Sequence, residues 1–263
     1  MNTRFCRVMF VAVIAAVFAV AANGQQTDAS IGPIEGESAE AELVLVAGAT
    51  GRTGSEIVAE LQASGYRVRA FVRDIDKARE KLGDEIEFSE GDVRDIETIE
   101  AALTGIDALI SAIGAGRSDP KNGPEFVDYG GVKNLADAAA AANLRQLILV
   151  SSMGVTDEDH ILNKMFNNVL MWKFKGEEAL RSSGVPYTIV RPGGLTNAEG
   201  GVNEIVFKQG DTDAGAIPRA DVARVCVASL NSEDARNKTF EINSGTNPAK
   251  SDVSAAFASL ESD

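Results

Sequence analysis

Short apolar segments alternate with amphipathic ones from residue 43 onward. Leu43 to Ala47 is an unbroken apolar run, which is typical of a strand that is buried on both faces of a sheet. Similar or alternating apolar runs predict further strands at 67–73, 86–88, 108–113, 147–150 and 187–190. The segments between them have the apolar spacing of amphipathic helices, at 55–64, 74–82, 96–103, 126–143 and 162–183.

This order of elements predicts the fold class. Strands that alternate with helices form right-handed βαβ units, which build a parallel sheet with helices on both faces. We therefore expect an α/β fold with a Rossmann-like, doubly wound parallel sheet over residues 41–260. The alternation weakens after Pro192, and a small C-terminal lobe is expected from about residue 193, with strands at 205–207 and 238–242 and helices at 220–230 and 253–260.

The loop after the first strand contains three glycines, in the sequence Gly48-Ala49-Thr50-Gly51-Arg52-Thr53-Gly54. Between a strand and a helix, the first glycine permits a sharp turn, the second lets a pyrophosphate approach the backbone, and the third lets the helix pack on the strand. Free N–H groups and the positive end of the helix dipole then attract the phosphates. Three glycines also fit an ordinary turn, but the flanking strand and helix favour a dinucleotide-binding loop.

The end of the second strand indicates which dinucleotide is bound. An acidic residue there binds the ribose 2′-hydroxyl of NAD, whereas an arginine pairs with the 2′-phosphate of NADP. Arg73 comes first at this place, and we expect Arg52 from the glycine loop to converge with it, which favours NADP(H). NAD(H) is the alternative, in which both arginines are ordinary surface residues and Asp74 binds the ribose.

Charge and composition exclude several other functions. The chain has 25 Lys and Arg against 39 Asp and Glu, a net charge of −14, which disfavours nucleic acid as a partner. With one histidine, His160, and two cysteines, Cys6 and Cys226, we expect no histidine-dependent triad, no disulfide framework and no metal site. The expected partner is a small-molecule substrate, and the oligomeric state stays open.

The first 24 residues form a separate segment. Arg4 and Arg7 precede an apolar run of 14 residues, Met9 to Ala22, and small residues follow it. This pattern is typical of a cleaved signal peptide for export to the periplasm or the medium, which leaves no membrane span in the mature chain. An uncleaved anchor and an organelle-targeting presequence are the alternatives. Residues 25–40 are polar and show no periodicity, so we expect a flexible linker.

Several motifs occur in the order and spacing of a known family. Besides the glycine loop, they are Val72-Arg73-Asp74, Gly91-Asp92-Val93, Ser111-Ala112-Ile113-Gly114, Ser151-Ser152-Met153-Gly154, Arg191-Pro192-Gly193-Gly194-Leu195 and Pro218-Arg219-Ala220-Asp221-Val222-Ala223. Over residues 43–260 the chain resembles the atypical short-chain dehydrogenase/reductases. The resemblance is closest to their NAD(P)H-binding, NmrA-like branch, with its small plant and bacterial members that bind NADP.

The resemblance implies a role for each loop. The cofactor-binding residues would be Gly48, Thr50, Gly51, Arg52, Thr53, Gly54 and Arg73 at the phosphates, Asp92 and Val93 at the adenine, Ala112, Ile113 and Gly114 at the adenosine and its ribose, and Ser151, Lys175, Pro192 and Gly193 at the nicotinamide end. These loops follow strand ends, which is where open α/β sheets bind ligands.

The catalytic tyrosine of the family is missing. Most short-chain dehydrogenases pair a proton-transferring tyrosine with a lysine four residues later, which holds the nicotinamide ribose and lowers the pKa of the tyrosine. Lys175 aligns with this lysine, Lys173 is the alternative, and Met171 stands at the tyrosine position. Because methionine cannot transfer a proton, Ser152, water or the substrate would supply it. Ser152 and Lys175 are therefore the candidate catalytic residues.

These observations predict an NADP(H)-dependent oxidoreductase that acts on a small carbonyl or quinone-like acceptor beneath the C-terminal lobe. A quinone draws its protons from water, so the missing tyrosine matters less there. The alternative is a non-catalytic NADP(H)-binding protein with a redox-sensing or regulatory role. A relative of the sugar-nucleotide epimerases fits less well, because the tyrosine–lysine pair and a larger substrate domain are missing. Export of the protein also conflicts with NADP(H) binding, because cells and organelles retain nicotinamide dinucleotides.

Overall fold

The computed structural model describes residues 41–263, except 117–119, 213 and 250–251. Residues 40–263 form one compact unit. The predicted export segment and linker lie outside the described residues. Within the described part, no helix combines the length and the apolar character that a membrane span requires.

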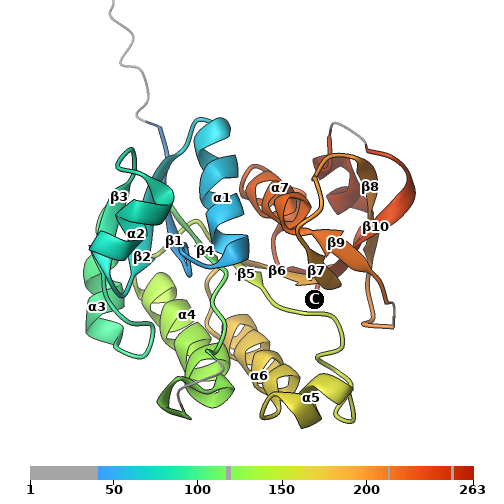
Figure 1. The fold of residues 1–263 in the computed structure, drawn as a ribbon, viewed down its shortest axis with the longest axis horizontal. Coiled ribbons are helices and arrows are strands. Elements are labelled where there is room, and N and C mark those ends of the chain that lie inside the picture. The colour runs from blue at the N-terminus through green and yellow to red at the C-terminus, as the bar shows by residue number, and fades with distance from the viewer. Residues whose placement is uncertain (1–40, 117–119, 213, 250–251) are drawn as a thin grey trace, which may run out of the picture. The chain divides into compact units, whose positions relative to one another are not determined.

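An eight-stranded sheet forms the centre of this unit, in the order β3-β2-β1-β4-β5-β6-β10-β8 (Figure 1). All of its strands run parallel except β8, which is antiparallel to β10. The strands are β1 (Leu43–Ala47), β2 (Arg67–Val72), β3 (Glu87–Glu90), β4 (Ala108–Ser111), β5 (Gln146–Val150), β6 (Tyr187–Pro192), β8 (Asn203–Lys208) and β10 (Lys238–Pro248). The predicted α/β fold with a Rossmann-like sheet is confirmed.

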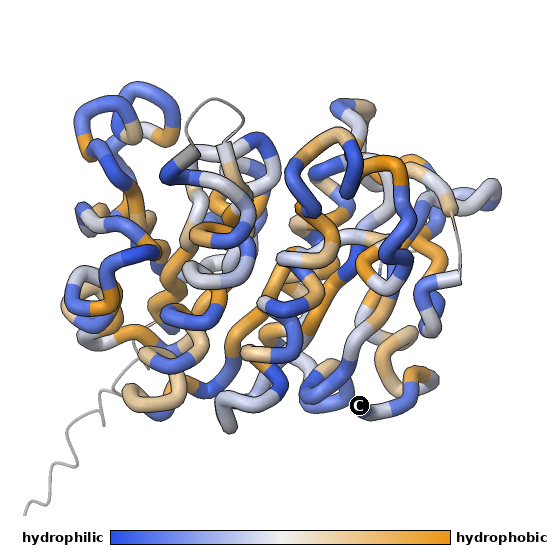
Figure 2. Tube along the Cα trace, turned by 90° about the horizontal axis from the view of Figure 1, so that it is seen from below, coloured by the Kyte–Doolittle hydropathy of each residue, from blue (hydrophilic) through white to orange (hydrophobic). Residues whose placement is uncertain are grey.

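Helices cover both faces of the sheet. Val44 and Val46 point into one hydrophobic cluster with α1 (Arg52–Ala63), α2 (Ile75–Leu82) and α7 (Arg219–Leu230). Leu43 and Leu45 point into the other cluster with α3 (Ile96–Ala102), α4 (Val132–Ala141) and α6 (Val169–Ser182). Figure 2 shows the same division, since hydrophobic colour follows the inner strands and hydrophilic colour the outer turns. The unbroken apolar run of β1 thus results from burial on both faces.

The C-terminal residues extend the same sheet. β10 pairs in parallel with β6, and Phe240 on β10 contacts the rings of Phe207 and Phe257 at centroid distances of 5.5 and 5.7 Å. A separate parallel pair, β7 (Gly194–Thr196) with β9 (Ala216–Pro218), connects this part to the end of β6. The sequence pattern did not predict this pair, because strands of three residues are too short to show periodicity.

Three predicted helices differ from the structure. The segment 162–183 forms two helices, α5 (Ile161–Met165) and α6, because Asn167 and Asn168 adopt φ values of 51° and 59° that no helix contains. The segment 126–143 begins as a π-helix, Glu125–Gly131, before α4, and 253–260 forms a 3₁₀ helix, Ser254–Ser259. Two further 3₁₀ turns are Pro120–Asn122 and Glu233–Ala235.

Candidate cofactor-binding site

A cavity of about 360 Å³ lies at the carboxyl ends of β1, β2 and β4. Nine of the predicted cofactor-binding residues line it: Gly48, Thr50, Gly51, Arg73, Asp92, Val93, Ala112, Ile113 and Gly114. The other lining residues are Phe71, Val72, Gly91, Gly116, Asn122 and Val127. The structure therefore brings the glycine loop and three separate strand ends together around one space.

The glycine loop requires its glycines for different reasons. Gly48 has a φ of +80°, and a Cβ there would lie 2.7 Å from the carbonyl oxygen of Ala112. A Cβ on Gly54 would lie 2.1 Å from the carbonyl oxygen of Gly48, so this buried glycine permits the close packing of α1 and lines no part of the cavity wall given above. Gly51, which lines the cavity, is the N-cap of α1 and provides no side-chain cap. Thr53 lies half-buried in the first turn. The first N–H groups of the helix are thus available to a phosphate.

Two basic residues lie near the glycine loop, Arg73 just after β2 and Lys81 on α2. Arg73 is exposed at the cavity. Lys81 on α2 donates from Nζ to the carbonyl oxygen of Thr50 at 2.6 Å. Asp74 caps α2: its carboxylate accepts the N–H of Lys77 at 3.0 Å and pairs with the Lys77 Nζ, and these contacts lower the pKa of Asp74. Sequence reasoning missed Lys81, because it lies eight positions beyond Arg73 with no motif around it.

Arg52 does not share the cavity of Arg73, contrary to the expectation that the two arginines converge. It lines a second space of about 300 Å³ between the first turns of α1 and α7. That space is bounded by Arg52, Ser55 and Glu56 of α1, by Thr196, Asn197 and Ala198, and by Arg219 and Ala220 of α7. The direction of a side chain at the start of a helix depends on the neighbouring helix, which the sequence motif does not specify.

Asp92 lies at the expected adenine side of the cavity as an ionised carboxylate. Arg94 donates to both of its oxygens, with 2.9 Å from Nε to Oδ1 and 2.7 Å from Nη2 to Oδ2. These hydrogen bonds lower the pKa of Asp92. Each carboxylate oxygen can accept more than one hydrogen bond, so the pair with Arg94 leaves Asp92 able to accept a further donor.

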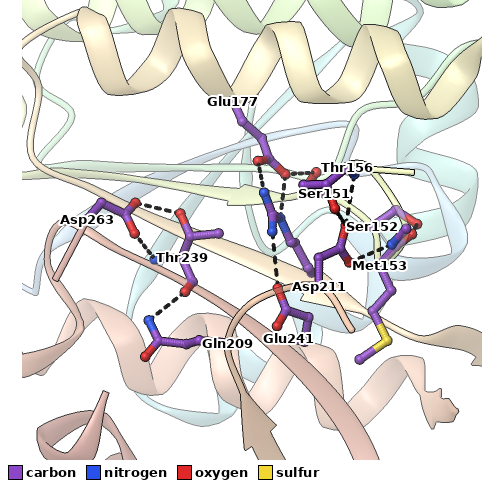
Figure 3. Close-up of polar contacts among 12 residues, drawn as sticks. Ser151, Ser152, Met153, Thr156, Glu177, Gln209, Asp211, Thr239, Glu241 and Asp263 are labelled. Atoms are coloured by element: carbon purple, nitrogen blue, oxygen red, sulfur yellow. Dashed lines mark hydrogen bonds and ion pairs between the residues drawn. The ribbon is translucent and has the colours of Figure 1, made fainter. Parts of the chain in front are cut away.

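The predicted nicotinamide end is built around a buried ion-pair network, part of which is drawn in Figure 3. Ser151 donates from Oγ to Oε1 of Glu177 at 2.5 Å. Arg191 on β6 donates to both oxygens of Glu177, at 3.0 and 2.6 Å, and its Nη1 lies 3.2 Å from Glu241 Oε1. Burial raises the pKa of Glu241, whose Oε2 has no partner within the described structure. Ser151 is thereby held in place, while the half-buried Ser152 donates to the carbonyl oxygen of Met153 at 2.9 Å.

Pro192 and Gly193 lie between the loop after β5 and strand β10. The carbonyl oxygen of Pro192 accepts the N–H of Met153 at 3.0 Å, and the N–H of Gly193 donates to Ile242 at 3.1 Å. A Cβ on Gly193 would lie 2.1 Å from Oδ1 of Asn243, so no larger residue fits. The ends of β5 and β6 therefore form one rigid edge.

The two candidate lysines face different surroundings. Lys173 points inward, with Nζ 2.8 Å from Oδ1 of Asp128, a fully buried carboxylate in the π-helix that also accepts the N–H of Ala115. Lys175 is exposed, and its Nζ lies 4.1 Å from the ring centroid of Trp172. If Lys173 is the family lysine, the tyrosine position four residues earlier is Val169 instead of Met171. Neither register contains a tyrosine.

A third cavity of about 420 Å³ adjoins the first one and shares Gly116 with it. Its wall combines apolar side chains with polar backbone and amide groups and consists of Ala115, Gly116, Pro124, Met165, Phe166, Asn167 and Val169. Met165 is 62% exposed. The break between α5 and α6 creates this wall, so the sequence, which predicted one continuous helix there, did not reveal it.

Known proteins resemble the chain in sequence and in fold. A family model described as NAD(P)H-binding matches residues 48–233. Sanguinarine reductase of Eschscholzia californica is 38% identical over 85% of this chain and 98% of its own length. A chloroplastic protein of Arabidopsis thaliana is 38% identical over 90% of this chain and 81% of its own length.

A solved structure shows the same architecture. A protein described as an NAD-dependent epimerase/dehydratase from Bacillus halodurans superimposes with a TM-score of 0.73 and 26% identity, over 83% of this chain and all of that one. The comparison agrees with the position of the cavity, which lies at the carboxyl ends of the strands.

Proposed function

Because the chain belongs to the NAD(P)H-binding family of atypical short-chain dehydrogenase/reductases, we propose that it is an NADP(H)-dependent reductase of a small carbonyl or quinone-like acceptor. The observation that carries this proposal is the cavity at the strand ends. It combines the uncapped N-terminus of α1, a glycine loop whose backbone a phosphate can approach closely, and Arg73 at the end of β2. The residues present thus fit a dinucleotide.

The basic residues support NADP(H) over NAD(H). Arg73 and Lys81 flank the place where the ribose 2′-substituent would lie, and both suit a phosphate. Asp74, which would bind the 2′-hydroxyl of NAD, is already engaged as the cap of α2 and by Lys77. The cap of α2 fixes the orientation of the Asp74 carboxylate.

The adjoining cavity supports a small acceptor that has both apolar and polar parts. Its wall, in which Pro124, Met165 and Val169 are the apolar side chains, meets the cofactor cavity at Gly116. The reduced nicotinamide supplies a hydride, and the acceptor takes this hydride together with one proton, so that an alcohol or a hydroquinone and the oxidised cofactor result. Since neither register provides a tyrosine, water or the hydroxyl of Ser152 delivers the proton.

The lysine role falls to Lys173 in this proposal, in place of Lys175. Lys173 is held by Asp128 close to the loop 115–116, which borders both cavities. Its ammonium group suits the hydroxyls of a ribose that lies between them. Lys175 covers Trp172 at the surface.

Turnover tests the function. Purified protein is mixed with NADPH and a panel of quinones and aldehydes, and the loss of nicotinamide absorbance is followed. We expect oxidation of NADPH by at least one acceptor, abolished by Gly51→Asp, which places a carboxylate in the phosphate path. Circular dichroism checks that this variant folds. Tight NADPH binding without oxidation across the panel would instead establish the second candidate, a non-catalytic NADP(H)-binding protein, which the missing tyrosine favours.

The first 24 residues act as an organelle-targeting presequence in our proposal. The chloroplastic location of the Arabidopsis relative supports this alternative, whereas the relatives give no support to a secretory signal. An organelle also retains the nicotinamide cofactor, which removes the conflict with export. A reporter fused to residues 1–40 is expected in the organelle fraction, and its recovery from the medium or periplasm would overturn this assignment.

A further inference from the structure

We propose that Arg52 and Arg219 form a clamp that holds the diphosphate of the dinucleotide between the first turns of α1 and α7. This inference rests on the proposed function and adds a residue from the C-terminal part to the cofactor site. α1 and α7 lie side by side on one face of the sheet (Figure 1), and both contribute to the same hydrophobic cluster. Arg52 is the first residue of α1 and Arg219 the first of α7, and both line the space of about 300 Å³ between them.

The guanidinium of Arg219 lies in this space with few hydrogen-bond partners. Its side chain is buried, with 9% of the residue exposed, and its one hydrogen bond within the described structure goes from Nη1 to Oδ1 of Asn197 at 2.7 Å. A guanidinium has five N–H donors, and this bond uses one of them, so the others are available to a ligand in the space that Arg219 lines. Burial lowers the pKa of Arg219, and the charge of Arg52 lowers it further.

The lack of a carboxylate partner distinguishes this arginine from others that are largely buried. Arg69, Arg181 and Arg191 each form an ion pair at 3.0 Å or less. Within the described residues, neither Arg52 nor Arg219 forms an ion pair, although Glu56 lines the same space and its charge acts against the lowering of the Arg219 pKa. Two guanidiniums and one carboxylate leave a net positive cavity, in a chain whose net charge is −14.

A diphosphate fits this cavity in charge and in position. Arg52 follows Gly51, which lines the adenosine cavity, and the uncapped N–H groups of α1 lie in the same turn. A dinucleotide whose adenosine lies in that cavity therefore passes the first turn of α1 with its diphosphate. Arginine binds phosphate oxygens with two parallel hydrogen bonds, and Arg219 would supply them from the opposite side.

The test compares two ligands that differ in the diphosphate. NADPH carries it, whereas adenosine 2′-monophosphate consists of the adenosine and its 2′-phosphate and has no diphosphate. By isothermal titration calorimetry we expect Arg219→Gln to weaken NADPH binding at least tenfold and to leave adenosine 2′-monophosphate unchanged. Arg236→Gln is the matched control, because it removes the same charge from a half-buried arginine that lines neither of the two cavities, and it is expected to bind NADPH like the wild type.

Three outcomes would contradict the clamp. Unchanged NADPH binding by Arg219→Gln overturns it, and so does equal weakening of both ligands. Inorganic phosphate that binds together with NADPH, and that Arg219→Gln abolishes, would assign the arginines to a separate phosphorylated molecule. Arg52→Gln, at an exposed position, repeats the test should the buried substitution fail to fold. Wild-type protein that binds NADPH but oxidises it with no acceptor would refute the reductase activity and leave the clamp intact.

Discussion

The two ends of the candidate site are built in opposite ways. The adenosine end consists of backbone groups and small residues, since Gly48, Gly51, Ala112 and Gly114 leave space by having little or no side chain. The nicotinamide end consists of buried side chains that pair with one another. Its central carboxylate, Glu177, contacts Ser151, Arg181 and Arg191. The first end depends on chain geometry and the second on ion pairing, so the two respond differently to substitution.

Removal of the shared carboxylate should have the largest effect. Glu177→Gln removes the carboxylate that Arg181 and Arg191 share and leaves Arg191 with Glu241 alone, and loss of one partner of a buried ion pair costs about 3–5 kcal/mol. Urea unfolding followed by circular dichroism measures the loss of unfolding free energy. The neighbouring Glu178→Gln is the control, because Glu178 is 56% exposed and its pair with Arg181 contributes at most about 1 kcal/mol. Equal losses in both variants would show that the nicotinamide end does not depend on its buried charges.

Substitution of the first glycine should affect the adenosine end in a different way. Gly48→Ala forces a methyl group against the Ala112 carbonyl in addition to the strain of its positive φ. Gly65→Ala is the matched control, since Gly65 has a φ of +84° with no atom near its Cβ position. We expect the control to lose about 1 kcal/mol of stability and to keep NADPH binding, while Gly48→Ala loses more and binds NADPH at least a hundredfold more weakly. Similar binding by both variants would mean that the close contact is not needed.

The sequence revealed the adenosine end because its determinants are local. Gly48, Gly51 and Gly54 lie within seven residues. The atoms that leave no room for a Cβ at these positions belong to the loop itself or to Ala112 at the end of β4, which is adjacent to β1 in the sheet. The nicotinamide end joins residues that are distant in the chain. Arg191 contacts Glu177 and Glu241, which lie 14 and 50 residues away, and no spacing rule predicts such pairs.

The parallel sheet with helices on both faces followed from the alternation of strands and helices, whereas the helix breaks did not. Two consecutive asparagines, Asn167 and Asn168, end one helix and begin another, although the apolar spacing continues across them. Lys173 reaches Asp128 where Gly176 lets α6 pack closely on the π-helix. Local backbone conformation, which the apolar pattern does not record, therefore determined the part of the site that was hardest to predict.

Substitution of Arg73, which tests the cofactor preference, should have a smaller effect on NADPH binding than substitution of Gly48. Arg73→Ala removes a charge that would pair with the 2′-phosphate, and a hydrogen bond to a charged group contributes about 1.5–3 kcal/mol. We expect NADPH binding to weaken about tenfold or more while NADH binding changes little, as measured by fluorescence titration of both cofactors. Arg79→Ala, an exposed arginine over Phe88, serves as the control. An equal loss for NADPH and NADH would remove the argument for NADP.

The smallest effect concerns the pH dependence at the nicotinamide end. Burial raises the pKa of Glu241 above its usual value of 4.5, so the folded protein binds this proton more tightly than the unfolded chain. The resulting stabilisation is complete below about pH 4.5 and is lost as the pH rises through the raised pKa.

Glu241→Gln cannot titrate and keeps an oxygen for Arg191. Urea unfolding from pH 4 to pH 7 should therefore show the stability of Glu241→Gln rising relative to the wild type as the pH increases. The exposed Glu233→Gln should follow the wild type throughout, because its 88% exposed side chain leaves the carboxyl in water. A difference between Glu241→Gln and the wild type that stays constant with pH would show that Arg191 offsets the burial of Glu241 completely, and the two ends of the site would then differ in geometry alone.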